Sequence, residues 1–247
     1  MAPDFLGSNM GDDQQLNNQI DQLARSNDDL SQFAYLAAHD LQEPLRAITG
    51  FLSLLKERHK AELSPEATDL LTEALSAADR MCLLTQALLT LSRVESQEIV
   101  FEMINSRHCV DDALSNLKTA IEAKDADIII GDLPVIRGNP TLLTMVFQNL
   151  VGNSLKFCDS RPKIRIDATR AANEWIFSVQ DNGVGFDMQY IEKLFHRFQR
   201  LHAKARYPGT GLGLALCKRI IDRHSGKIWA RSDKNQGATF CFSLSAE

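Results

Sequence analysis

A repeat of apolar residues at alternating steps of four and three constrains the fold of this chain most. It predicts one long helix over residues 14–60. The first part of its seam runs through Leu16, Ile20, Leu23, Asn27, Leu30, Ala34, Ala37 and Leu41. Such a seam is typical of a two-stranded coiled coil, in which a polar seam residue such as Asn27 sets the register. We therefore expect residues 14–36 to form a coiled coil.

The repeat is interrupted near Pro44. The seam continues at Leu45, so the step from Leu41 is four where three is due. Such an irregularity changes the local winding of the helix, and a proline in a helix interior costs about 3 kcal/mol or more. At 100° per residue, His39 lies about 160° from Leu41 around the helix. We expect His39 to face solvent or a partner.

A second helix is predicted to begin at "LSPE", residues 63–66. Ser64 is expected as the N-cap, with Pro65 as the first helical residue. Its seam keeps the same spacing through Leu70, Ala74, Ala77, Met81, Leu84, Leu88 and Leu91. Two such helices form an antiparallel hairpin whose apolar stripe exceeds what the hairpin alone can bury. Because two hairpins complete a four-helix bundle, we expect a homodimer.

The pattern becomes mixed after residue 98. Strands are predicted at 99–104, 127–131, 134–138, 163–170, 174–181, 227–232 and 238–245. Helices are predicted at 106–124, 139–156, 188–197 and 211–225. The change predicts an all-α domain followed by an α+β domain, with the boundary near residues 96–100. Residues 1–13 show no pattern and are expected to be disordered or expression-derived.

Composition and charge exclude several classes. The net charge of −5 argues against a nucleic-acid binder. No apolar run approaches the roughly 20 residues that span a bilayer, and no stretch has the order of a signal peptide. We therefore expect no membrane contact by this chain. Five cysteines without a C-x-x-C pair indicate a reducing compartment, so a cytoplasmic location is expected, as a whole protein or as the cytoplasmic part of a larger sensor.

The stretch "NLVGNSLKF", residues 149–157, places polar side chains on one face of a predicted helix. Asn149, Asn153 and Lys156 follow at i, i+4 and i+7. Two amides and an ammonium suit a metal ion and phosphate oxygens, although an ordinary polar surface has the same pattern.

Two further stretches carry glycines. "DNGVGF", residues 181–186, follows a predicted strand, where Asp181 is either an acceptor for an amino group or part of an ordinary turn. "PGTGLGLAL", residues 208–216, opens a helix and is typical of an anion site at a helix N-terminus. It lacks the P-loop string and lies outside a dinucleotide-binding unit.

Together, the three stretches resemble the nucleotide-binding domain of sensor histidine kinases, a Bergerat-type fold shared with gyrase, MutL and Hsp90. "LFHRFQRLH", residues 194–202, resembles the phenylalanine box of that family. "FAYLAAHDLQEPLRAI", residues 33–48, resembles its phospho-acceptor box, in a version common among phytochrome-type and PAS-linked kinases. The resemblance runs from about residue 20 to the end of the chain.

The resemblance implies a fold class of two parts. The first is an all-α helical hairpin, forming a dimeric four-helix bundle preceded by a coiled coil, with residues 37–97 as the dimerisation and histidine phosphotransfer domain. The second is an α+β two-layer sandwich of Bergerat type, with residues 98–247 as the catalytic ATP-binding domain. The implied activity is ATP-dependent autophosphorylation of His39, followed by transfer to an aspartate of a response regulator.

Residues beside the histidine receive roles from the same resemblance. Asp40 would act as base and orienter of the imidazole. Helix geometry favours Glu43, one turn further on, because side chains at i and i+1 do not face each other, unless a winding change near Pro44 brings Asp40 round. Many relatives carry threonine or asparagine in place of Glu43, and its charge should repel a phospho-aspartate. Weak phosphatase activity is therefore predicted.

In the catalytic domain, the resemblance assigns ATP and Mg²⁺ as cofactors. Asn153 would hold Mg²⁺, Asn149 and Lys156 would lie beside the phosphates, and Phe157 would cover the nucleotide. Asp181 would read the adenine amino group. The remaining implied residues are Gly183 and Gly185 for close approach, Arg197 for γ-phosphate delivery, and Gly209, Thr210, Gly211, Leu212 and Gly213 around a short lid at 203–208.

Three other functions compete with this interpretation. A phosphotransfer or scaffold protein could carry a degenerate nucleotide domain, a Bergerat-type ATPase clamp would not need His39, and a metal protein could use the six histidines. For a kinase, the expected partners are a second copy of the chain, the receiver domain of a response regulator and an upstream sensor domain outside this chain.

Overall fold

The computed structural model describes residues 36–60, 62–96, 98–196, 207, 210–233 and 236–246. The chain divides into two compact units between Gln97 and Glu98. Residues 1–13 and nearly all of the predicted coiled coil lie outside the described residues.

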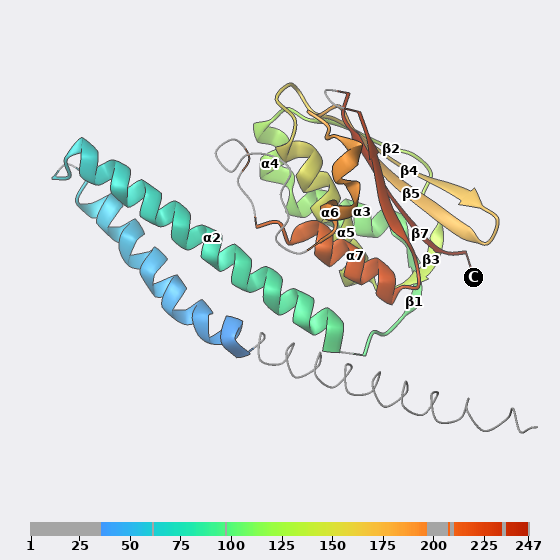
Figure 1. The fold of residues 1–247 in the computed structure, drawn as a ribbon, viewed down its shortest axis with the longest axis horizontal. Coiled ribbons are helices and arrows are strands. Elements are labelled where there is room, and N and C mark those ends of the chain that lie inside the picture. The colour runs from blue at the N-terminus through green and yellow to red at the C-terminus, as the bar shows by residue number, and fades with distance from the viewer. Residues whose placement is uncertain are drawn as a thin grey trace, which may run out of the picture. The chain divides into compact units, whose positions relative to one another are not determined.

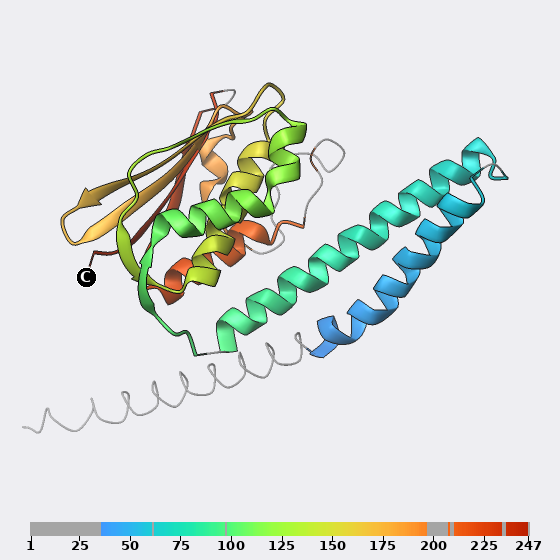
Figure 2. The same cartoon turned by 180° about the vertical axis from the view of Figure 1, so that it is seen from behind.

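The first unit contains two long antiparallel helices (Figures 1 and 2). The described part of the first helix spans residues 36–58 and passes through Pro44 without interruption. The second, α2, spans Pro65–Ser96, as the sequence predicts. Ser64 caps it, since its Oγ accepts a hydrogen bond from the Ala67 N–H at 3.1 Å. Across the hairpin, Lys56 Nζ donates to Thr72 Oγ1 at 3.2 Å.

The buried stripe of α2 lies one residue away from the predicted seam. Its buried and half-buried residues again follow steps of four and three, through Leu71, Leu75, Ala78, Cys82, Thr85 and Leu89. The predicted seam is buried only in part. Leu70 and Met81 are exposed, as are Leu41 and Ile48 on the first helix, whereas Leu45 and Leu91 of the same seam are buried. The hairpin thus has two neighbouring apolar stripes. One packs within the chain, and the other leaves several large side chains exposed.

The second unit is a sheet covered on one face by helices (Figure 1). The five-stranded sheet has the order β2-β4-β5-β7-β6, in which β2 and β4 are parallel and the other neighbours antiparallel. Its strands are β2 (Asp127–Ile130), β4 (Lys163–Ala171), β5 (Glu174–Asp181), β6 (Ile228–Ser232) and β7 (Ala238–Ser245). A separate antiparallel pair consists of β1 (Glu102–Asn105) and β3 (Val135–Gly138).

The helices of this unit are α3 (Ser106–Asn116), α4 (Lys118–Ala123), α5 (Pro140–Lys156), α6 (Ile191–Leu194) and α7 (Gly213–Arg223), with a 3₁₀ turn at Met188–Tyr190. The predicted helix 106–124 is interrupted at Leu117, which has φ −100° and ψ 5°. Next to it, the Asn116 side chain donates to Gln148 Oε1 on α5 at 3.3 Å. Local helix propensity does not predict such a tertiary contact. The predicted strand 99–104 begins only at Glu102.

Three aromatic rings join α5 to the sheet. Phe147 of α5 makes edge contacts with Phe177 of β5 and Phe242 of β7, at centroid distances of 6.0 and 5.5 Å. The two strand residues stack on each other at 4.9 Å. All three side chains are fully buried. Burying a side chain of this kind contributes about 1.5–3 kcal/mol, so this cluster fixes α5 and the polar face that it carries.

His224 joins the end of α7 to the start of α5. Asn139, the N-cap of α5, donates its backbone N–H to His224 Nε2 at 3.1 Å. The ring's Nδ1 lies 2.8 Å from the Ile220 carbonyl oxygen, so Nδ1 carries the proton of a neutral ring. Phe101 packs its ring edge-on against the imidazole at 4.9 Å. Burial lowers the pKa of His224.

We expect His224 to make the second unit less stable in mild acid. The unfolded chain takes up a proton near pH 6.5, whereas the folded chain takes it up only at lower pH because burial lowers the pKa of His224. The stabilisation is complete above about pH 6.5 and is lost as the pH falls through the folded pKa. Urea unfolding at pH 7.5 and 5.5 measures the free energy of unfolding of the wild type and of His224→Gln, whose side chain keeps a donor and an acceptor but does not titrate. If both proteins lost the same stability between pH 7.5 and 5.5, the assignment would be contradicted.

Candidate active site

Asp181 is a buried carboxylate at the last position of β5. Its Oδ1 accepts hydrogen bonds from the Gly183 N–H at 2.9 Å and the Ala238 N–H at 3.1 Å. Its Oδ2 accepts from Ser154 Oγ at 3.1 Å. Burial raises the pKa of Asp181, and these three hydrogen bonds act in the opposite direction. The carboxylate is therefore held in one orientation as a hydrogen-bond acceptor.

Sequence reasoning missed two of the groups that orient Asp181. Ser154 is a buried polar residue next to Asn153 on α5, and a serine on the apolar face of a predicted helix was the signal that could have revealed it. Ala238 contributes only its backbone N–H, for which the sequence carries no side-chain signal.

Gly183 and Gly185 are required by the chain's own backbone. A Cβ on Gly183 would lie 2.6 Å from the Phe157 carbonyl oxygen. Gly185 has φ +61°, and a Cβ there would lie 2.9 Å from the Gly237 carbonyl oxygen in the β6–β7 turn. The close approach that the sequence predicts at these glycines is therefore made by neighbouring backbone, which packs the loop after Asp181 against α5 and β7.

The predicted polar face of α5 is present. Asn149, Asn153 and Lys156 are half-buried on a helix whose other face is fully buried. The Asn149 amide nitrogen donates to the Met145 carbonyl at 2.9 Å, and a Cβ on Gly213 would lie 2.5 Å from Asn149 Oδ1. The first residue of α7 thus lies directly against this face.

The glycine string leads into α7 as the sequence predicts. Gly211 has φ +73°, a left-handed conformation that glycine adopts readily. The Leu212 N–H donates to Thr210 Oγ1 at 3.3 Å. Leu212 is also the N-cap of α7, and its apolar side chain cannot cap the helix. The first N–H groups of α7 therefore receive no side-chain cap from its N-cap residue.

Phe157 connects the end of α5 to the loop after β5. Its carbonyl accepts from the Val184 N–H at 2.9 Å. Lys156 Nζ lies 4.5 Å from the centroid of the Phe157 ring, within the range of a cation–π contact.

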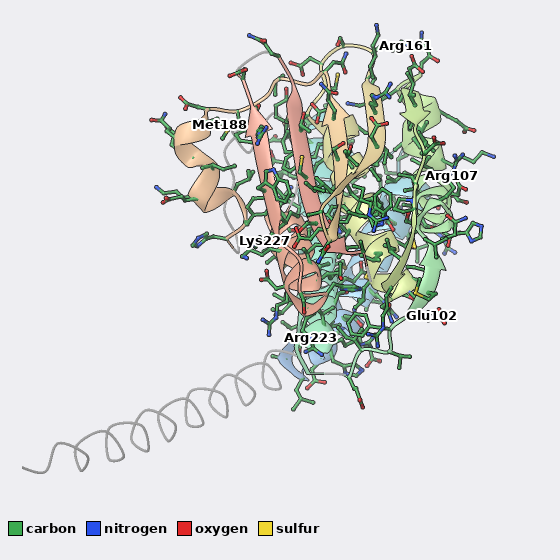
Figure 3. All side chains as sticks on the ribbon, turned by 90° about the vertical axis from the view of Figure 1, so that its right-hand side faces the viewer. Glu102, Arg107, Arg161, Met188, Arg223 and Lys227 are labelled. Atoms are coloured by element: carbon green, nitrogen blue, oxygen red, sulfur yellow. The ribbon has the colours of Figure 1, made fainter. Side chains whose placement is uncertain are left out.

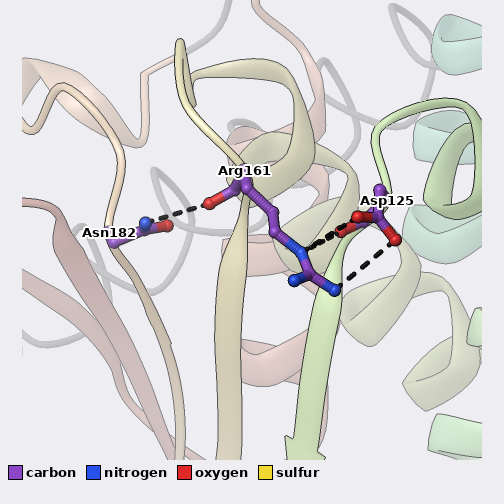
Figure 4. A network of polar contacts seen from close by, with 3 residues as sticks. All are labelled: Asp125, Arg161 and Asn182. Atoms are coloured by element: carbon purple, nitrogen blue, oxygen red, sulfur yellow. Dashed lines mark hydrogen bonds and ion pairs between the residues drawn. The ribbon is translucent and has the colours of Figure 1, made fainter.

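A network of polar contacts holds the loop of residues 157–162, which begins at Phe157 (Figure 4). Arg161 Nε donates to the Asp125 carbonyl at 2.7 Å, and its guanidinium pairs with the Asp125 carboxylate at 3.3 Å. Asn182 Nδ2 donates to the Arg161 carbonyl at 3.1 Å. Figure 3 shows Arg161 at one end of this unit and Arg223, the last residue of α7, at the other. Because Ile164 pairs with Asp181 in the sheet, the Arg161 end is also the Asp181 end.

His39 is exposed on the first helix, as predicted, with 65% of its side chain accessible. Its Nδ1 lies 3.3 Å from Asp40 Oδ1. The expectation that residues at i and i+1 do not face each other is therefore wrong for this pair, because both side chains are exposed and can bend toward each other. An Nδ1–H held by Asp40 leaves the lone pair on Nε2.

Two predicted site residues, Arg197 and Gly209, lie outside the described residues. Among the described residues, no group of three or more His, Cys, Asp or Glu side chains could hold a metal ion. No helix in the described ranges is both long and apolar enough to cross a membrane.

Comparisons with known families agree with this arrangement. Residues 138–247 match the model of the histidine kinase-, DNA gyrase B- and HSP90-like ATPases. The second unit is therefore an ATPase domain of this class, with the Bergerat fold. Residues 29–97 match the His Kinase A phospho-acceptor domain. The chain belongs to the sensor histidine kinases.

Its relatives include the phytochrome-like protein Cph1 of Synechocystis, 43% identical over 90% of this chain and 30% of its own length. The sensor protein kinase WalK of Staphylococcus aureus is 31% identical over 87% of this chain and 54% of its own. The chain spans less than a third of its cyanobacterial phytochrome relatives.

Solved structures share the fold. Full-length ShkA in complex with AMPPNP has a TM-score of 0.66 at 21% identity, over 86% of this chain and 45% of that one. The nucleotide-free catalytic domain of the histidine kinase ThkA has a TM-score of 0.53 at 26% identity, over 60% of this chain and 99% of that one.

Replacing Asp181 with asparagine should separate nucleotide binding from stability. The amide keeps the size of the side chain but loses an acceptor, so we expect the affinity for a fluorescent ATP analogue to fall at least about tenfold. The melting temperature should stay unchanged or rise, because a buried charge is removed. The control is Asp187→Asn, since Asp187 is an exposed carboxylate that also accepts a backbone N–H. Wild-type affinity in Asp181→Asn would contradict the assignment.

Proposed function

We propose that this chain is an ATP-dependent protein-histidine autokinase. It phosphorylates His39 and passes the phosphoryl group to an aspartate of a response regulator's receiver domain. The observation that carries the proposal is the presence in one chain of two features. One is the exposed His39 with Asp40 at its Nδ1, and the other is the buried, oriented Asp181 beside the polar face of α5.

His39 is the nucleophile in this proposal. Its Nε2 lone pair forms the N–P bond to the γ-phosphoryl group as the bond between that phosphorus and the oxygen of ADP breaks. Asp40 holds the proton on Nδ1 and stabilises the positive charge that develops on the ring. The main tasks of the protein are then positioning and charge neutralisation.

The second unit offers groups that fit ATP. Asp181 Oδ2 is an acceptor suited to the exocyclic amine of adenine. Asn149 and Lys156 suit phosphate oxygens, and the first N–H groups of α7 suit an anion. Asn153 offers an amide oxygen of the kind that Mg²⁺ accepts, and Mg²⁺, when bound, supplies neutralisation of phosphate charge. Phe157 covers the nucleotide in this proposal, and Arg197 and Gly209 act as the family resemblance implies.

Several features support a homodimer in a signalling system. The hairpin carries large exposed apolar side chains, which a second hairpin would bury in a four-helix bundle. They are Leu41, Ile48, Phe51, Leu70 and Met81.

An upstream sensor domain would act through residues 14–36, in a cytoplasmic setting. Glu43 disfavours an incoming phospho-aspartate by charge repulsion, so weak phosphatase activity is expected.

Incubation with ATP labelled at the γ-phosphate tests the proposal. We expect acid-labile, alkali-stable label on the wild-type chain and none on His39→Ala. The matched control is His59→Ala, because His59 is also an exposed histidine with a carboxylate at its Nδ1, at 3.0 Å from Glu62. Label that persists in His39→Ala would overturn the assignment of the nucleophile.

Replacing Asp40 with asparagine tests the orienting role. The amide is neutral and can present its NH₂ to Nδ1, which favours the wrong tautomer. We expect the autophosphorylation rate at saturating ATP to fall roughly 100-fold, with KM for ATP unchanged. Glu43→Gln serves as the comparison, since Glu43 is the alternative helical neighbour. An undiminished autophosphorylation rate in Asp40→Asn would remove this role from Asp40. A rate that falls about 100-fold in Glu43→Gln but not in Asp40→Asn would assign the role to Glu43.

A further inference from the structure

Tyr207 is buried beside the candidate nucleotide site, in a part of the sequence to which sequence reasoning gives no role beyond the lid. It is 6% exposed. Its hydroxyl donates to Asp159 Oδ1 at 2.7 Å, and the two residues are 48 positions apart in the chain. Its ring lies 5.1 Å from the ring of Phe157, at an interplanar angle of 57°. Tyr207 therefore contacts loop 157–162 in two ways.

Loop 157–162 is a firmly held base for these contacts. Beside the pairing of Arg161 with Asp125, Lys124 Nζ donates to the Cys158 carbonyl at 3.2 Å and to the Leu155 carbonyl at 2.6 Å. The Cys158 thiol lies 3.4 Å from Asn182 Oδ1. These contacts tie the loop to the ends of α4, α5 and β5. Asp159 is exposed, but the backbone on both sides of it is fixed.

Phe157 transmits the contact to the site. Its ring contacts both the Tyr207 ring and Lys156 Nζ. Its carbonyl accepts from Val184 and approaches Gly183, whose N–H is bonded to Asp181. Phe157 therefore contacts Tyr207 with its ring and the loop that orients the Asp181 carboxylate with its carbonyl.

We propose that Tyr207 is a positioning residue for the nucleotide. Its hydroxyl, through Asp159, anchors the chain three residues before Thr210 to loop 157–162, and its ring fixes the Phe157 ring at the end of α5. The anchor thus holds Tyr207 against the C-terminal end of α5. The proposal rests on ATP binding by the second unit, as proposed above.

The hydroxyl can be removed without losing the ring. Tyr207→Phe should raise the Kd for a fluorescent ATP analogue and the KM for ATP by about tenfold, the scale of one hydrogen bond to a charged group. The autophosphorylation rate at saturating ATP should be nearly unchanged. Asp159→Ala should have the same effect as Tyr207→Phe, and the double variant should be no worse than either single variant, because all three lack the same bond. Tyr190→Phe, at an exposed tyrosine, should match the wild type.

The outcomes separate this inference from the proposed function. If the wild type does not bind the analogue, the proposed function fails. If the wild type binds it and Tyr207→Phe binds equally well, only the role of Tyr207 is overturned. A lowered melting temperature with unchanged Kd and KM would make Tyr207 a structural residue and would also overturn the inference. So would additive losses in the double variant, because independent effects on affinity would mean that the two residues do not act through one contact.

Discussion

The packing of α5 on the sheet is the constraint on which the rest of the second unit depends. Phe147, Phe177 and Phe242 lock one face of this helix against β5 and β7. Because a helix presents opposite faces to core and solvent, the same packing fixes where Asn149, Asn153 and Lys156 lie. The end of the helix then delivers Phe157 to the loop after β5. This cluster of three aromatic rings thus sets the position of most of the polar groups that a nucleotide would meet.

Asp181 shows the usual conflict between stability and function. A buried carboxylate is unfavourable for folding, and burial raises the pKa of Asp181. Three hydrogen bonds offset this cost, from α5, from the loop after β5 and from the start of β7. The same three bonds hold the carboxylate in one orientation. A site that recognises an amino group needs such a fixed acceptor, and the surrounding fold supplies the groups that keep it in place.

The hairpin also combines apolar packing with an oriented polar side chain, but here several of these groups are exposed. Its helices carry two adjacent apolar stripes, and one of them already packs within the chain. The second stripe includes Leu70 and Met81, which are exposed. His39 is also exposed, with Asp40 beside its Nδ1. The exposed histidine is thus accessible for chemistry, and the exposed apolar side chains are suited to association.

Much of the fold could be predicted from the sequence, because helices and strands follow local periodicity. The two long helices, the cap at Ser64, the glycine string before α7 and the polar face of α5 all have signals within a few residues. The interruption at Leu117 could not be predicted in this way, since it coincides with a contact between Asn116 and α5. The one-residue offset of the hairpin stripe was equally hidden, because both stripes have the same spacing in the sequence.

The sequence by itself determined the kinds of elements, their order and the residue types of the site, since these depend on neighbours along the chain. The tertiary structure decided which groups surround Asp181, why Gly183 and Gly185 must be glycine, and that Tyr207 meets Asp159. Ser154 and Ala238 reach Asp181 from 27 and 57 residues away. Contacts over such separations depend on how the layers pack, and no local pattern of the chain encodes them.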